Sequence, residues 1–168
     1  MEWSTDTVQP RERFSYWREA VCRSIFNLSI EAPAGHFAAR MTARSAGFVR
    51  IALGESTGYV VSRSKREVES APDGSYSVYL QLRSQAIISQ CDQVLTFQAG
   101  DIAISDLQHP FTATLAGGGR RVTTVIPCEM IDRRAPWLRK TALHRLAATR
   151  PTLISPAAIL LKWPRIQR

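Results

Sequence analysis

The side chains that could perform chemistry lie far apart in this sequence. A catalytic metal site needs histidines and a carboxylate that converge on one ion, often with two histidines close together on a strand. His36, His109 and His144 are isolated from one another. No Ser/His/Asp grouping suited to nucleophilic catalysis stands out either. These observations favour binding over turnover, so we expect a protein that is not an enzyme and that needs neither a metal nor another cofactor.

The cysteines point to a reducing compartment. Cys22, Cys91 and Cys128 are odd in number and widely spaced, which argues against a disulfide framework and against a Cys-x-x-Cys metal or redox site. The 168-residue chain contains no apolar run near the roughly 18 residues that a membrane span needs. Its N-terminus also lacks the basic segment and apolar stretch of a secretory signal. We therefore expect a cytoplasmic protein with no membrane contact.

The positive charge is concentrated at the end of the chain. The formal net charge is +8. Residues 133–168 carry Lys and Arg but no Asp or Glu, whereas residues 1–132 are close to neutral. One interpretation is a nucleic-acid binder with a basic tail. The other is a near-neutral sensor domain, after which a different segment begins.

Two apolar patterns bracket the chain. Phe14, Trp17, Val21 and Ile25 form one stripe in residues 6–26, which predicts an amphipathic helix. Residues 134–149 repeat apolar side chains at helical spacing before Pro151, which predicts a second helix. We predict no secondary structure for residues 152–168.

Between these helices the apolar period changes to two, which indicates β-structure. Short runs rich in β-branched and aromatic residues alternate with turn residues, and this pattern favours a sandwich or barrel. We predict strands at residues 37–44, 48–53, 59–64, 76–83, 86–90, 94–98, 102–105, 111–115 and 121–126.

Candidate ligand-binding residues lie on the less apolar face of these strands. Tyr79 and Gln81 come from one strand, Gln90 comes from the next, and Arg63 is a further candidate. An apolar pocket with a few polar anchors is the usual form of a small-molecule site. The alternative for Tyr79 and Gln81 is a solvent-facing strand surface, and the alternative for Arg63 is a strand-edge or salt-bridge role.

Particular residues resemble the N-terminal ligand-binding domain of AraC-family transcription regulators. The likeness covers roughly residues 4–150. It includes Ser4-Thr5-Asp6, the run from Arg13 to Glu19, Phe37-Ala38-Ala39-Arg40, Gly47, Arg63, Tyr79-Leu80-Gln81-Leu82, Gln90, Gly100-Asp101, Asp106, His109-Pro110-Phe111 and Ile126-Pro127.

The resemblance implies a mainly β fold, a cupin-like antiparallel β-barrel or sandwich with an N-terminal helix and a C-terminal linker helix. Residues 1–132 would form the effector-binding barrel, and residues 133–150 the linker and dimerisation helix. Residues 151–168 would be an irregular basic tail, for which an out-of-frame origin is one hypothesis. The residues expected to dimerise are Trp137, Leu138, Ala142 and Leu146.

Taken together, these features predict an effector-binding and dimerisation domain that lacks the DNA-binding half of an AraC-type regulator. Its expected partners are a small-molecule effector and a second copy or a full-length relative, without specific DNA binding by this chain alone. The main alternative is a free-standing cupin-like enzyme or small-molecule carrier. A nucleic-acid binder that uses the basic tail is the third.

Overall fold

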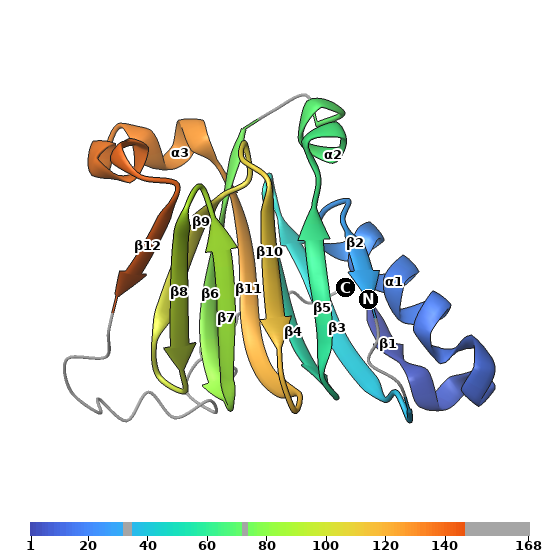
Figure 1. Ribbon diagram of the computed structural model, residues 1–168. Helices are drawn as coiled ribbons and strands as arrows, with labels where there is room; N and C mark the ends of the chain where they lie inside the picture. Colours follow the sequence, from blue (N-terminus) through green and yellow to red (C-terminus); the bar gives the residue numbers. More distant parts are fainter. Residues whose placement is uncertain (32–34, 72–73, 147–168) are drawn as a thin grey trace.

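A computed structural model describes residues 1–31, 35–71 and 74–146, which form two packed antiparallel sheets (Figure 1). The seven-stranded sheet contains, in spatial order, β1 (Glu2–Ser4), β3 (Ala39–Ala46), β4 (Val49–Ser56), β11 (Gly119–Pro127), β6 (Ser75–Arg83), β9 (Ile102–Asp106) and β12 (Leu143–Leu146). The five-stranded sheet contains β2 (Ser29–Glu31), β5 (Tyr59–Arg63), β10 (Phe111–Leu115), β7 (Gln85–Gln90) and β8 (Gln93–Gln98).

This arrangement confirms the predicted mainly β, cupin-like fold with an N-terminal helix. The nine strands expected from the sequence all form, each within three residues of its predicted bounds. The two sheets do not close into a barrel, so the sandwich form of the prediction is the one observed. The main apolar core lies between the sheets and includes the wholly buried Ile88 and Phe97.

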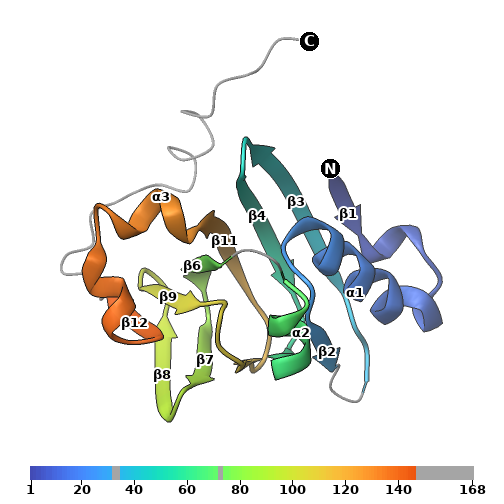
Figure 2. The same cartoon turned by 90° about the horizontal axis from the view of Figure 1, so that it is seen from above.

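Helix α1 (Arg13–Ser24) lies along the part of the sandwich that contains β1 and β3 (Figure 2). Trp17 and Val21 from the predicted stripe are buried against the sheets, together with Ala20. The helix begins later than the pattern suggested. Two short 3-10 turns, η1 (Thr5–Thr7) and η2 (Pro10–Glu12), occupy the first part of the predicted span.

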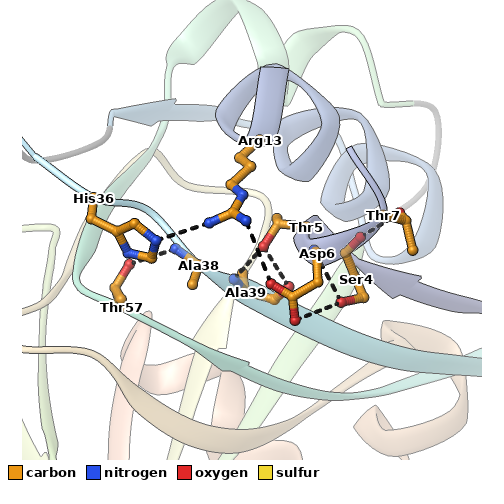
Figure 3. Close-up of polar contacts among 9 residues, drawn as sticks. All are labelled: Ser4, Thr5, Asp6, Thr7, Arg13, His36, Ala38, Ala39 and Thr57. Carbon is orange, nitrogen blue, oxygen red and sulfur yellow. Dashed lines mark hydrogen bonds and ion pairs between the residues drawn. The ribbon is translucent and has the colours of Figure 1, made fainter. Parts of the chain in front are cut away.

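Polar contacts fasten the N-terminal segment to β3 (Figure 3). The buried Thr5 hydroxyl donates to the Ala39 carbonyl at 3.1 Å and accepts from the Ala39 amide at 2.9 Å. Arg13 Nη1 donates to His36 Nε2 at 2.9 Å, and Arg13 Nη2 lies 3.8 Å from the Asp6 carboxylate. These contacts hold the start of α1 beside the sandwich.

The helix predicted for residues 134–149 is wrong over the residues that the structure describes. After α3 (Cys128–Asp132), the chain forms the 3-10 helix η3 (Pro136–Lys140) and then strand β12. Strand β12 pairs with β9, which otherwise would be an open edge, and its Leu143 enters the main core. Sheet pairing therefore overrides the helical spacing. Residues 147–168, which include the end of the predicted linker helix at 147–150 and the whole tail 151–168, lie outside the described residues.

The segment of α3 and η3 covers the face of the larger sheet that points away from the main core. Tyr76, Ile104, Cys128 and Leu138 form a second, smaller apolar cluster there. Strands β6 and β9 are consequently covered on both faces. No helix in the described ranges is long and apolar enough to cross a membrane.

Candidate functional site

A cavity of about 30 Å³ lies between the two sheets and beneath α1. A volume of this size holds about two water molecules. Its wall is mostly apolar, and small residues on the inner face of β4 leave space opposite the helix. The lining residues are Trp17, Val21, Ile25, Phe26, Leu28, Met41, Ala52, Gly54, Ser56, Tyr59, Val61, Tyr79, Phe111, Ala113, Leu115, Gly119, Arg121 and Thr123.

Arg121 is the one charged side chain among the residues that line this cavity. Strand β11 alternates, so Arg121 shares the inward face with the buried Thr123 and Val125. Its guanidinium carbon lies 5.4 Å from the ring centre of Tyr79, and Nη2 lies 3.5 Å from Tyr59 Oη. Nη1 is buried and has no hydrogen-bond partner among the described residues. The guanidinium thus retains donor capacity inside the sandwich.

Trp17 supplies a second unpartnered donor to the same cavity. The side chain is 2% exposed, and its indole Nε1 makes no hydrogen bond with any described residue. Helix α1 carries Trp17 at the centre of its buried stripe, where the ring contacts those of Phe37 and Tyr59. A buried donor without an acceptor costs about 1–3 kcal/mol. Together, Trp17 and Arg121 suit a small guest molecule that presents acceptor atoms.

Tyr79 is the sequence-predicted ligand residue that the structure places in the cavity wall. It is 3% exposed, so the solvent-facing alternative does not apply. Its hydroxyl shares a 3.2 Å hydrogen bond with Ser105 Oγ, and its ring lies beside Phe97 and under the Arg121 guanidinium. Contact with a ligand through Tyr79 stays a prediction.

Gln81 and Gln90 are buried but do not line the cavity. Gln81 Nε2 donates to the Arg83 carbonyl at 2.7 Å. Gln90 Nε2 donates to the carbonyls of Asp106 and His109, at 2.8 and 3.1 Å, and so fastens the turn between β9 and β10. Burial excludes the solvent-facing alternative for Gln81 as well. The ligand-binding role of both glutamines stays a prediction.

Arg63 lies away from the cavity, in a cleft at one open end of the sandwich. It is 4% exposed, and Nη1 donates to the Asn27 carbonyl at 2.9 Å. Its guanidinium carbon is 5.4 Å from the ring centre of Phe26. The structure thus brings Tyr79 to the cavity, and it places Gln81, Gln90 and Arg63 elsewhere.

The residues expected to dimerise do not form one helical stripe. Leu138 is buried in the smaller cluster, whereas Trp137 and Leu146 are 42% and 45% exposed. Ala142, in the short link between η3 and β12, is partly buried, and its carbonyl accepts from the Asp106 amide at 2.8 Å. Their role in dimerisation stays a prediction.

The histidines remain separate in the structure. His36 accepts from Arg13, His109 Nε2 lies 3.9 Å from Asp106, and His144 contacts Thr141. Within residues 1–31, 35–71 and 74–146, no three His, Cys, Asp or Glu side chains gather closely enough to hold a metal ion.

One motif was missed in the sequence. Residues 54–58, Gly-Glu-Ser-Thr-Gly, have the Gly-x-Ser-x-Gly spacing of a hydrolase nucleophile. That motif works on a sharp strand-to-helix turn. Here it spans the end of β4 and the turn into β5, and Ser56 makes no side-chain hydrogen bond to a described histidine. The arrangement is therefore not that of a nucleophile elbow.

The two unpartnered donors were also missed as a pair. The predicted apolar stripe contains Trp17, and the alternation in β11 is the sequence signal that places Arg121 on the inner face. Their proximity to one cavity depends on how α1 packs, which no local pattern contains.

Two packed antiparallel sheets with an interior cavity define a cupin-like domain. Residues 17–160 match the AraC-binding-like domain family, and the chain belongs to that family. The crystal structure of the AraC-like transcriptional activator CuxR has a TM-score of 0.75 at 18% identity. That match covers 88% of this chain and 54% of CuxR, so it shows a shared fold over about half of the relative.

Two further similarities are more limited. A cupin superfamily protein from Desulfitobacterium hafniense has a TM-score of 0.43 at 18% identity, over 57% of this chain and 82% of that protein. An uncharacterized protein in the nit 5′ region of Bacillus sp. (strain OxB-1) is 32% identical over 108 residues. The match spans 64% of this chain but only 42% of the Bacillus protein.

Proposed function

We propose that this chain is the effector-binding domain of an AraC-type transcription regulator, and that its effector occupies the cavity between the sheets. Membership of the AraC-binding-like family supports the sensor role. The observation that carries the choice of site is a pair of buried donors, Trp17 Nε1 and Arg121 Nη1, which have no partner in the described part of the chain and line one mostly apolar cavity.

The effector that fits this cavity has an apolar body and at least one acceptor atom. The aliphatic and aromatic wall contacts the body, and the acceptor receives hydrogen bonds from Arg121 Nη1 and Trp17 Nε1. Because the cavity measures about 30 Å³, the effector must displace side chains or move α1 outward to enter. Helix α1 carries Trp17, so occupancy would change how this helix packs and give the signal a route to the surface.

We also propose that the chain binds its effector without turning it over, that it uses no metal or other cofactor, and that it acts in the cytoplasm. A dimer contact through the C-terminal segment is supported by the exposed apolar surface of Leu146, which ends the edge strand β12, and of Trp137, whose ring contacts His144 on that strand. Leu146→Glu is expected to shift a dimer toward monomer in sedimentation. A strictly monomeric wild-type chain at high concentration would remove dimerisation from the proposal.

The effector site is tested by ligand-observed NMR with a panel of small aromatic ketones, amides and carboxylates. Compounds that bind the wild-type chain should bind about tenfold more weakly to Arg121→Met, because a hydrogen bond from a charged donor is lost. Trp17→Phe should weaken the binding of the same compounds, because the indole donor is lost.

Arg120→Met is the matched control for Arg121→Met. Arg120 precedes Arg121 but lies in a groove with Arg40 and Glu55 outside the cavity, so this variant should bind like the wild-type chain. If every binding compound is retained equally by the Arg121, Trp17 and Arg120 variants, the cavity is not the effector site.

A further inference from the structure

Two arginines from different sheets line a cleft of about 510 Å³ at one open end of the sandwich, here called the mouth cleft. Arg50 lies near the start of β4 and shares its inner face with the buried Ala52. Arg63 ends β5 and shares its inner face with Tyr59 and Val61, which are also buried. The two guanidinium-bearing side chains therefore come from opposite walls of the space between the sheets.

Neither arginine forms an ion pair with a residue that the structure describes. Among the described residues, no carboxylate lies within 4.0 Å of the guanidinium of Arg50 or Arg63. Arg63 Nε is buried and has no hydrogen-bond partner in the described part of the chain. Buried cations in proteins are normally paired, because an unpaired charge costs considerable free energy to remove from water.

Glu67 is the acidic residue that lines the same cleft, and its carboxylate is already engaged. Oε2 accepts from the amide and hydroxyl of Ser64 at 2.7 and 2.8 Å, while Oε1 accepts from Ser29 Oγ at 3.1 Å. These bonds close the capping box of α2 (Lys65–Glu69), the short helix that follows β5 (Figure 1). The two arginines and Glu67 leave the cleft with a net positive charge.

Burial lowers the pKa of both guanidiniums, and the nearby charge of Arg50 lowers the pKa of Arg63 further. Glu67 opposes that shift at Arg63. Both arginines stay protonated near neutral pH, since an arginine pKa lies far above 7. An anion between them would offset both the burial and the mutual repulsion.

We propose that the mouth cleft is a binding site for an oxyanion group, a carboxylate or a phosphate, of a small molecule. The oxyanion bridges Arg50 of the larger sheet and Arg63 of the smaller sheet, and the unpartnered Nε–H of Arg63 donates to it. Guanidinium groups suit this chemistry because their planar donor forks match carboxylate and phosphate oxygens. The site is separate from the cavity of the proposed function, and its test measures anion binding alone.

The test titrates the full chain with inorganic phosphate and, separately, with acetate, in a low-chloride buffer. Calorimetry gives the affinity, and the side-chain Nε–H signal of Arg63 in a 15N-correlated NMR spectrum gives the location. We expect saturable binding of at least one probe together with a shift of that signal. Phosphate-selective binding assigns a phosphate-bearing ligand, and acetate-selective binding assigns a carboxylate.

Arg50→Gln removes one charge from the cleft and is expected to weaken binding by about tenfold or more. Arg44→Gln is the matched control, since Arg44 is an exposed arginine on the neighbouring strand β3. It removes the same charge outside the cleft and should leave binding unchanged. Equal affinities for wild type and both variants, or no saturable binding of either probe, would overturn this site and leave the proposed function untouched.

Discussion

The guanidinium carbon of Arg63 lies 5.4 Å from the ring centre of Phe26, and Phe26 lines both the mouth cleft and the cavity between the sheets. The same ring makes an edge-on contact with Phe111 at 6.2 Å between ring centres. One aromatic side chain is therefore shared by the walls of the two hollows. A ligand in either hollow contacts a residue that also forms the wall of the other.

Replacement of Phe26 by alanine should remove this shared wall residue and destabilise the fold. Phe26 is 8% exposed, and truncation of a buried phenylalanine costs about 3–5 kcal/mol. Urea denaturation measures the change in the free energy of unfolding. Phe48→Ala is the control, because Phe48 is 85% exposed and should cost close to nothing. Equal stability losses for the two variants would show that Phe26 does not form the wall described.

Strand positions could be predicted from the sequence because their signals are local. Alternation of apolar residues and turn residues such as Gly100-Asp101 mark where a strand starts and ends, whatever it pairs with. The short helix α2, which the strand pattern does not predict, has an equally local signal in the Ser64/Glu67 capping box. Alternation does not show which face of a strand points toward the main core. In β6 both faces are covered, so the polar Gln81 points to the main core and Tyr76 to the smaller cluster.

The structure of the C-terminal segment and the set of residues that share the cavity depend on contacts with distant parts of the chain. The spacing of Leu138, Ala142 and Leu146 suits a helix, but pairing with β9 makes Leu143–Leu146 a strand. The sequence placed Tyr79 on a ligand-facing strand surface, and that residue does line the cavity. Trp17 and Arg121 line the same cavity only because α1 packs over the sandwich, and the local sequence pattern does not contain that tertiary contact.

Gln90 should prove important for stability, because its buried amide holds two carbonyls of the β9–β10 turn. Gln90→Leu removes the side-chain donor from both carbonyls, although the Asp106 carbonyl keeps the His109 amide as a donor at 3.2 Å. The loss is expected to cost about 2 kcal/mol, measured by chemical denaturation. Gln93→Leu, at an exposed position in the adjacent hairpin, should change stability little. A Gln90→Leu variant as stable as wild type that fails to bind effector would instead favour the ligand-binding role predicted from the sequence.

Asp132 should make stability depend on pH in the acidic range. Its carboxylate accepts from Arg139 Nη2 and, at 3.0 Å, from Tyr76 Oη, and the Arg139 bond is the main reason that the pKa of Asp132 is lowered. A carboxyl group whose pKa is lower in the folded state than in the unfolded state stabilises the protein at pH values above the unfolded-state pKa of about 4. This stabilisation is lost as the pH falls through the folded-state pKa. Asp132→Asn should therefore be less stable than wild type at pH 7.

The same measurement at lower pH supplies the contrast for Asp132→Asn. Thermal unfolding midpoints of wild type and variant should converge as the pH falls below about 4. Glu129→Gln, at an exposed position on the same helix α3, should track wild type throughout. If the difference in unfolding midpoint between Asp132→Asn and wild type stays constant from pH 7 to strong acid, the ionised carboxylate of Asp132 does not stabilise the fold.

Cys128 should be the least reactive thiol in the native chain. It is 8% exposed in the smaller apolar cluster, and burial raises the pKa of its thiol to about 11. At pH 8 the reactive thiolate is then on the order of one part in a thousand of the total thiol. Cys91 is exposed and should react first with an aromatic disulfide reagent, whereas Cys128 should react only after urea unfolds the chain.

A Cys91→Ser variant removes the fast reaction of the exposed thiol, and peptide mass spectrometry shows which cysteine reacts slowly. Modification of native Cys128 as fast as Cys91 would mean that α3 and η3 do not cover the outer face of the larger sheet.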